Sequence, residues 1–301
     1  VSFQMKSGVD IHGGFAGTEI ARDSRDWDVH ETILSGDIGV ADDPADNSYH
    51  VVVGANSATL DGVHVVDGYA NGVSPADFGG GMYNNSVSST VVNCEFRNNH
   101  AATDGGGMFN NNVASTVTGC VFQGNTAAND GGGMVNRYCS PSITDSTFRE
   151  NRAAGDGGGM YNKGATATIQ RCEFIGNTAE ANHGGGLINT TGTGTATVED
   201  CVFRSNSAGI DGGGAYDRYT TATYRRCSFA DNVAASAGGG FGIHDSPHVV
   251  ENCVFTGNAA QAGGGLSDYE SDTCQLMNCT FTGNTATNGG AVSYTRVVFS
   301  L

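Results

Sequence analysis

The sequence predicts an all-β fold: a right-handed single-stranded parallel β-helix, a solenoid with three short strands in each coil of about 26 residues. Three observations predict it. A phenylalanine followed by an asparagine three residues later recurs at a nearly constant interval, and a glycine triplet recurs at the same interval. Glycine makes up 47 of the 301 residues, about twice its average share, which favours turns and close backbone contacts over helices.

The Phe-x-x-Asn element sets the length of the repeat. Successive phenylalanines lie 26 residues apart, except for one step of 29 residues between Phe174 and Phe203. The phenylalanines are Phe96, Phe122, Phe148, Phe174, Phe203, Phe229, Phe255 and Phe281. Equal spacing predicts that they stack inside the solenoid, one in each coil, and that each asparagine amide bonds the equivalent amide one coil away.

Two further inward columns follow from the same spacing. Cysteine stands two residues before the phenylalanine in seven coils, at Cys94, Cys120, Cys172, Cys201, Cys227, Cys253 and Cys279. We expect these cysteines to be small buried apolar residues at a tight corner. Alanine follows each asparagine by two residues, as in Ala101 and Ala127, where a narrow interior leaves room only for a methyl group.

The glycine triplet begins the next strand of each coil. The triplets end at Gly81, Gly107, Gly133, Gly159, Gly186, Gly214, Gly240 and Gly265. Residues after the triplet alternate between apolar and other types, so Met108 is expected to point inward and Phe109 outward. The stretches are too short for amphipathic helices, which excludes a helical or leucine-rich repeat.

The regular repeat occupies only part of the chain. Residues 79–301 are predicted to form regular β-helix repeats, and residues 1–78 to form irregular N-terminal coils and a cap, all in one continuous domain. Phe15 and Trp27 are expected to cover the N-terminal end, because an open sheet edge would pair with other chains.

Charge and hydropathy exclude two classes of partner. The 14 Lys and Arg against 31 Asp and Glu give a net charge of −17, which repels a phosphate backbone and excludes nucleic acid. No apolar run reaches the length of about 18 residues that a membrane span needs.

The chain opens at Val1 without a signal peptide and stops at Leu301 within a repeat. We therefore expect an export signal and any anchor to lie outside this segment, and an extracellular or cell-surface location.

An acidic column stands at the position three residues before the last glycine of the triplet. Its members are Asp104, Asp130, Asp156 and Asp211, with His183 in the coil between the last two. Carboxylates stacked one coil apart repel each other, so two interpretations are open. Either the column binds Ca²⁺ through its oxygens, or each aspartate caps a turn by accepting bonds from nearby N–H groups.

An outward aromatic row is the candidate ligand-binding surface. It consists of Tyr83, Phe109, Tyr161 and Tyr216, and Arg137, Lys163 and Arg218 lie two residues beyond the row in their own coils. Aromatic faces can stack on sugar rings, and cations can hold uronic carboxylates. In a lyase, Ca²⁺ on the aspartates would neutralise the uronate while Lys163 or Arg137 takes the C5 proton. The other interpretation is that these are ordinary strand residues and solvated cations.

The repeat resembles a known family. The motif Gly-Gly-Gly-Met-Tyr-Asn, at Gly79–Asn84 and Gly157–Asn162, together with Phe-x-x-Asn, resembles the GGA-I and F-x-x-N repeats of the chlamydial polymorphic outer-membrane proteins. The likeness covers residues 79–292. It implies a secreted or autotransported passenger, adhesin-like or structural, on a fold that is loosely called pectate-lyase-like.

Two functions follow from these observations. The first is a noncatalytic secreted or cell-surface β-helix, adhesin-like or structural, whose partner is a polysaccharide or another host or cell-surface ligand. The second is a calcium-dependent lyase or hydrolase that acts on an acidic polysaccharide.

Overall fold

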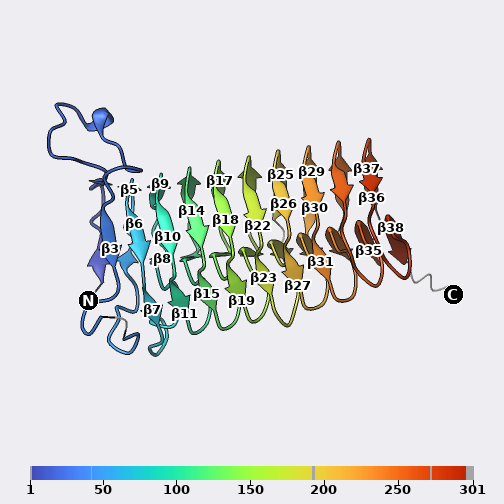
Figure 1. Cartoon of the computed structure of the whole chain (residues 1–301), viewed down its shortest axis with the longest axis horizontal. Coiled ribbons are helices and arrows are strands. Elements are labelled where there is room, and N and C mark those ends of the chain that lie inside the picture. The colour runs from blue at the N-terminus through green and yellow to red at the C-terminus, as the bar shows by residue number, and fades with distance from the viewer. Residues whose placement is uncertain (1, 42, 192–193, 272, 296–301) are drawn as a thin grey trace.

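The computed structural model describes residues 2–41, 43–191, 194–271 and 273–295. The backbone winds into coils that stack along one axis, with the two ends of the chain at opposite ends of a rod (Figure 1). Equivalent strands of successive coils pair in parallel and in register. The predicted parallel β-helix is therefore confirmed.

Four parallel sheets run along the described part of the rod. Sheet A follows the glycine triplets and has eleven strands. They are β1 (Phe3–Gln4), β4 (Val52–Val53), β8 (Met82–Asn85), β12 (Met108–Asn111), β16 (Met134–Arg137), β20 (Met160–Lys163), β24 (Leu187–Thr190), β28 (Ala215–Arg218), β32 (Phe241–His244), β35 (Leu266–Tyr269) and β38 (Val292–Thr295).

Sheet B follows sheet A in each coil and has ten strands. They are β2 (Ile11–His12), β5 (Thr59–Asp61), β9 (Thr90–Val92), β13 (Thr116–Thr118), β17 (Ser142–Thr144), β21 (Thr168–Gln170), β25 (Thr195–Glu199), β29 (Thr221–Arg225), β33 (His248–Glu251) and β36 (Cys274–Met277).

Sheet C carries the motif phenylalanines and has ten strands. They are β3 (Ile33–Ser35), β6 (His64–Val66), β10 (Glu95–Arg97), β14 (Val121–Gln123), β18 (Thr147–Arg149), β22 (Glu173–Ile175), β26 (Val202–Arg204), β30 (Ser228–Ala230), β34 (Val254–Thr256) and β37 (Thr280–Thr282).

Sheet D is a fourth, shorter sheet that the prediction of three strands per coil missed. Its strands are β7 (Tyr69–Ala70), β11 (His100–Ala101), β15 (Thr126–Ala127), β19 (Arg152–Ala153), β23 (Thr178–Ala179), β27 (Ser207–Ala208) and β31 (Val233–Ala234). Each has two residues, which is too short to give an alternating pattern in the sequence. Its inward position is the alanine column, which is buried as predicted.

The phenylalanines of sheet C form one continuous stack in the core. From Phe96 to Phe281, neighbouring rings of sheet C lie 4.7 to 5.0 Å apart with planes within 8° of parallel. Phe241 of sheet A packs beside this stack, 5.8 Å from Phe229. This spacing equals the separation of paired strands, about 4.8 Å, so the backbone register imposes the ring stack. The cysteine column lies beside it and is buried from Cys94 to Cys253.

The motif asparagines form the predicted amide ladder. Asn151 is buried, and its Nδ2 donates to the carbonyl of Phe122 (2.9 Å) and to Oδ1 of Asn177 (3.0 Å). Its own Oδ1 accepts from the backbone N–H and the side-chain amide of Asn125, both at 3.0 Å. The amide therefore satisfies polar groups in three successive coils.

A second amide ladder was not predicted. It runs along the inward side of sheet A through Asn84, Asn110, Asn136, Asn162 and Asn189, with Nδ2 to Oδ1 distances of 2.8 to 2.9 Å between neighbours. It ends where Nδ2 of Asn189 donates to the buried carboxylate of Asp217 (2.7 Å). The interior thus contains two buried ladders of amides beside its apolar columns.

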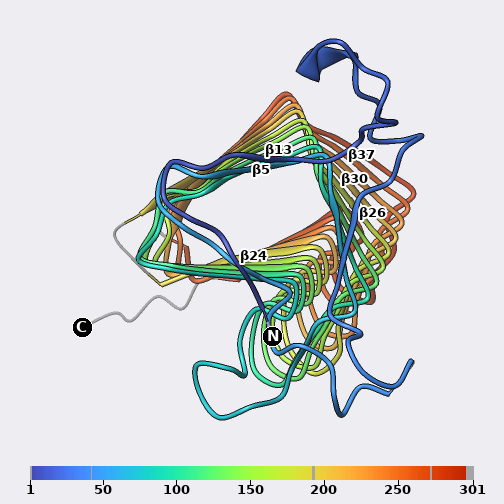
Figure 2. The same cartoon turned by 90° about the vertical axis from the view of Figure 1, so that its left-hand side faces the viewer.

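The N-terminal coils differ from the expected cap. The chain leaves the stack after Ile11–His12 and makes an excursion that contains a short 3₁₀ helix, η1 (Arg22–Ser24), and lies to the side of the coils (Figures 1 and 2). Phe15 is 44% exposed, so the expectation that it covers the end of the core is wrong. Trp27 lies near Gly62 of the first coils, with the Arg25 guanidinium over its ring at 5.1 Å.

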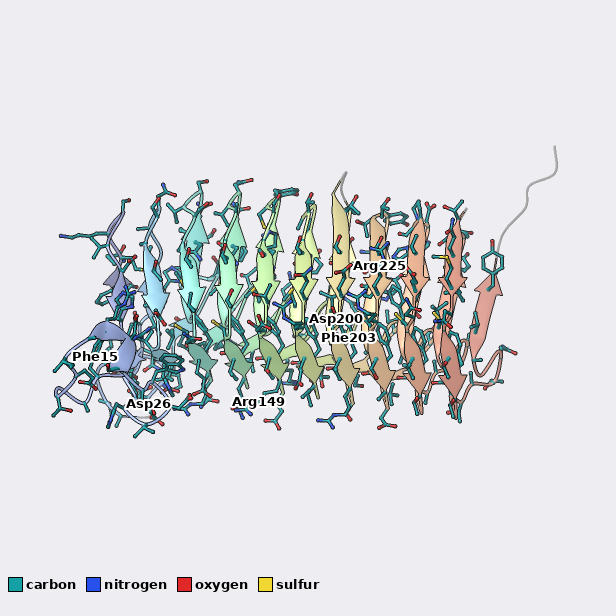
Figure 3. All side chains as sticks on the ribbon, turned by 90° about the horizontal axis from the view of Figure 1, so that it is seen from above. Phe15, Asp26, Arg149, Asp200, Phe203 and Arg225 are labelled. Atoms are coloured by element: carbon teal, nitrogen blue, oxygen red, sulfur yellow. The ribbon has the colours of Figure 1, made fainter. Side chains whose placement is uncertain are left out.

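Exposed ion pairs connect neighbouring coils on the outer surface. Arg225 reaches Glu251 at 3.1 Å and Glu199 at 3.4 Å, and Arg226 forms a two-bond pair with Asp200. Figure 3 labels Arg225 and Asp200, one residue of each group. Each pair spans one coil. Pairs of this kind contribute about 0 to 1 kcal/mol each, because water screens their charges.

We predict that Asn151→Ala lowers the free energy of unfolding by about 3 kcal/mol, because it removes four hydrogen bonds of the ladder and leaves the backbone N–H of Asn125 buried without its partner. Chemical denaturation of purified protein measures this change. The control is Asn85→Ala, an exposed strand residue whose loss is expected to cost less than about 0.5 kcal/mol. Equal effects of the two substitutions would contradict the ladder's role.

Candidate functional site

The outward face of sheet A is covered by the chain itself. Between sheet D and sheet A each coil bends into a lobe that lies against this face, as the view along the rod shows (Figure 2). The first glycine of each triplet lies in the left-handed region and packs on the row. A Cβ on Gly105 (φ 70°) would lie 3.0 Å from Cβ of Phe109. Only a residue without a side chain allows this approach.

The aromatic row is therefore a second, smaller core. Phe109, Tyr161 and Tyr216 are 4%, 5% and 3% exposed, and they form one apolar cluster with Val135 and Ile188. Tyr83 is half-buried and stacks between His50 and Phe109. The prediction that this row presents open ring faces to solvent is wrong, because the glycine lobe covers the rings. A sugar ring cannot stack on a face that is already buried.

The aspartate column lies in the lobe and caps successive coils. Oδ1 of each aspartate accepts a hydrogen bond from the backbone N–H one coil further on. The four distances are 3.1 Å for Asp104 to Asp130, 3.0 Å for Asp130 to Asp156, 2.9 Å for Asp156 to His183, and 2.9 Å for Asp211 to Ala237. These hydrogen bonds agree with the interpretation in which each aspartate caps a turn.

The geometry does not gather ligands for a metal. Among the residues that the structure describes, no three His, Cys, Asp or Glu side chains are grouped so that they could hold a metal ion. Burial and the neighbouring carboxylates of Asp104 and Asp156 raise the pKa of Asp130 to about 6, although the bond from the Asp156 N–H lowers it. Asp130 therefore holds its proton more tightly than an exposed aspartate does.

Arg137 forms an ion pair with the aspartate column. Its guanidinium pairs with the fully buried carboxylate of Asp104 and lies 5.3 Å from the ring centre of Phe109 and 5.6 Å from that of Phe78. Asp104 also accepts from Nδ2 of Asn129 at 2.8 Å. A guanidinium that neutralises a buried carboxylate has a structural role, because removing it would leave that charge unpaired.

The two other predicted cations stay at the margin of the lobe. Lys163 and Arg218 are half-buried, and sheet register places Lys163 beside Arg137 and Arg218 beside Thr190. The Arg218 guanidinium lies over the ring of Tyr219 at 5.8 Å. The structure therefore brings the predicted cations onto one edge of sheet A, beside a buried aromatic row rather than an open one.

A buried polar network was missed by the sequence analysis. Oδ2 of Asp217 lies 2.7 Å from Nε2 of His248, and Oδ1 accepts from the hydroxyl of Tyr224 at 3.0 Å and from the Asn189 amide. The side chains of Asp217 and His248 have no exposed surface. A network sealed in the core can fix packing but cannot reach a substrate. The signal in the sequence was Asp217, which breaks the column of asparagines at that position.

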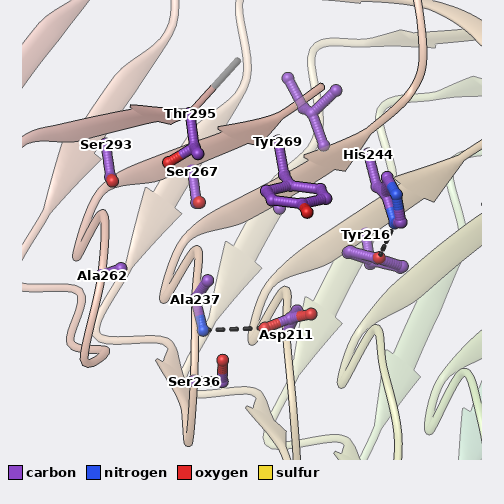
Figure 4. Close-up of a pocket in the computed structure, with 12 residues that line it drawn as sticks. Asp211, Tyr216, Ser236, Ala237, His244, Ala262, Ser267, Tyr269, Ser293 and Thr295 are labelled. Carbon is purple, nitrogen blue, oxygen red and sulfur yellow. Dashed lines mark hydrogen bonds between the residues drawn. The ribbon is translucent and has the colours of Figure 1, made fainter. Parts of the chain in front are cut away.

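A pocket opens where the aromatic row ends. Along the row, Tyr216 is followed in register by Gly242, Ser267 and Ser293, and in the acidic column Asp211 is followed by Ala237 and Ala262. The loss of large side chains on both sides leaves a hollow of about 310 Å³. Figure 4 shows Asp211, Tyr216, His244 and Tyr269 around it.

The pocket wall is polar and aromatic. The hydroxyl of Tyr216 lies 3.3 Å from Nδ1 of His244, and the other face of Tyr216 stacks on His183 at 4.4 Å. The Tyr269 ring is edge-on to His244 at 5.0 Å and 42% exposed. Burial raises the pKa of Tyr216 above its ordinary value, so its phenol stays protonated. This pocket, unlike the buried row, can admit a ligand.

The in-register columns, the covering glycine lobe and the absence of a described helix longer than η1 define a single-stranded parallel β-helix protein. None of the described helices is long and apolar enough to cross a membrane.

Comparison with protein families agrees with this class. The family described as "Right handed beta helix region" matches residues 45–203 and 157–286, which together cover most of the chain. The chain belongs to this family of right-handed β-helix proteins. The Chlamydia polymorphic membrane protein repeat matches residues 278–295, over β37 and β38. No curated protein and no solved structure matches the chain.

We predict that Asp130→Asn stabilises the protein at neutral pH. The folded-state pKa of about 6 lies above the ordinary value of 3.8, so the folded state binds more protons than the unfolded state between these values. Stability is therefore lost as the pH rises through this window. An asparagine can still accept the Asp156 N–H without that loss. We expect a gain of about 2 kcal/mol near pH 7 and almost none below about pH 4.

Urea denaturation of both proteins across this pH range measures the difference. Asp245→Asn is the control, because Asp245 is exposed and its substitution removes the same charge. A gain that is independent of pH, or an equal gain in the control, would contradict the explanation.

Proposed function

We propose that the protein is a noncatalytic rod, adhesin-like or structural, that is exported and displayed at the cell surface. The observation that carries the proposal is that the three aspartates and the arginine proposed for catalysis on the outward face of sheet A bond to the protein itself. Asp104, Asp130 and Asp156 cap the next coil, and Arg137 neutralises Asp104. A face whose charged groups bond one another supplies rigidity rather than a reactive centre.

The match to a Chlamydia polymorphic membrane protein repeat supports a surface location, because that repeat is named for membrane proteins. The regular coils support a spacer role, since each coil adds the same rise and holds whatever lies on it at a fixed position. The net charge of −17 supports a partner other than nucleic acid.

The alternative function, a calcium-dependent lyase or hydrolase on an acidic polysaccharide, needs a cation on Asp130 and Asp156 and a free base beside it. Lys163 is the remaining candidate for that base, because Arg137 is paired. A uronate chain would also approach a protein of strongly negative charge, which disfavours its binding.

The first test measures lyase activity. Purified protein is incubated with pectin, alginate and glycosaminoglycans, with and without Ca²⁺, and the ultraviolet absorbance of unsaturated uronates is followed. We expect no increase on any polymer, while a known pectate lyase gives one. An increase that requires Ca²⁺ and disappears in Lys163→Ala would refute the noncatalytic proposal in favour of the alternative.

The second test measures location. Antibody raised against the purified rod is applied to intact producing cells and to permeabilised cells. We expect equal labelling of both, and loss of labelling after brief protease treatment of intact cells. A signal that appears only after permeabilisation would be evidence against surface display.

A further inference from the structure

We propose that the pocket beside Tyr216 binds a primary ammonium group. The pocket is acidic in composition: among the described residues that line it, Asp211 is the one carboxylate, and neither Lys nor Arg is present. Oδ1 of Asp211 accepts from the Ala237 N–H at 2.9 Å, as Figure 4 shows. Its second oxygen lies 3.4 Å from Nδ1 of His183 and has lone pairs left for another donor.

Asp211 differs from the earlier aspartates of its column. Asp104 is fully buried and paired with Arg137, whereas the Asp211 side chain is 21% exposed and lines a pocket. Sheet register places His244, not an arginine, at the position that Arg137 has beside Asp104, and Nδ1 of His244 lies 3.3 Å from the Tyr216 hydroxyl while its Nε2 lies 3.9 Å from Glu270. The carboxylate at the end of the column is thus available to a cation from outside.

The other lining groups suit a cation with N–H donors. Tyr216 and Tyr269 offer aromatic rings, which attract cations through their negative faces. Ser236, Ser267 and Ser293 supply hydroxyl oxygens that can accept from the remaining N–H bonds. Glu270, which lies 3.9 Å from His244, adds negative charge near the rim. The net charge of −17 increases the local concentration of cations and repels anions.

This inference deepens the proposed function, because it names the ligand chemistry of an adhesin-like rod. Two sources on cell surfaces present primary ammonium groups, lysine side chains and amino sugars. A quaternary ammonium lacks the N–H donors, and an N-acetylated sugar lacks the charge.

Calorimetric titration of the purified full chain tests the inference, independently of where the protein resides in the cell. The ligands are Nα-acetyl-lysine methylamide, glucosamine, choline and N-acetylglucosamine. We expect at least one of the two primary amines to bind, and which of them binds more tightly identifies the source. Choline and N-acetylglucosamine are expected to bind at least about tenfold more weakly, since a charge-assisted hydrogen bond is lost.

Two variants assign the binding to the pocket. Asp211→Asn keeps an oxygen for the Ala237 N–H and removes the charge, so the affinity for the amine is expected to fall by about tenfold or more. Ser267→Phe places a ring where Phe109 and Tyr161 stand in earlier coils, and is expected to fill the pocket and abolish binding while the rod remains folded. Asp245→Asn, which removes an exposed charge outside the pocket, is expected to leave the affinity unchanged.

Three outcomes would overturn the inference: no binding of either amine, equal binding of N-acetylglucosamine, or an unchanged affinity in Asp211→Asn. Absence of binding would leave the noncatalytic surface rod intact, because the lyase and location tests do not depend on this pocket. Thermal unfolding of each variant confirms that a lost signal comes from the pocket rather than from unfolding.

Discussion

The structure depends on one constraint, the parallel in-register pairing of each coil with the next. Since equivalent residues must lie about 4.8 Å apart, every inward side chain has its own counterpart as its neighbour. Phenylalanine satisfies this constraint because rings can stack in one orientation. Asparagine satisfies it because its amide has both a donor and an acceptor, so a chain of amides leaves no member unpaired. Both ladders follow from the geometry of the backbone.

The same constraint explains the outward face of sheet A. Aspartates that stack there are forced close together, and they persist because each accepts a backbone N–H from the next coil. The unfavourable burial and proximity of these carboxylates raise the pKa of Asp130, and Arg137 neutralises the buried carboxylate of Asp104. Where glycine, serine and alanine replace the aromatic and acidic residues, the aromatic row and the aspartate column end and the pocket beside Tyr216 opens. In a regular solenoid, an open pocket forms where the repeat departs from its own pattern.

The repeat predicted much of the interior and little of the exterior. Phe96, Asn99 and Cys94 lie in buried columns as their spacing indicates. The second amide ladder was missed although strand alternation after Met82 places Asn84 inward, because asparagine is ordinarily a surface residue. The aromatic row was assigned correctly to the outer side of its strand, but its burial depends on the lobe that covers it. Two-residue strands and a covering lobe give no periodic signal.

The sequence alone determined the parallel β-helix, its repeat length and the columns of phenylalanine, cysteine and motif asparagine, because these depend only on spacing along the chain. The tertiary structure decided which outward residues are free. Tyr161 and Tyr216 have the same position in the repeat, yet one is enclosed by neighbours on both sides and the other borders a pocket. The difference depends on side chains one coil away and on a lobe folded against them. Exposure is a property of the packed assembly, so only the three-dimensional arrangement could fix it.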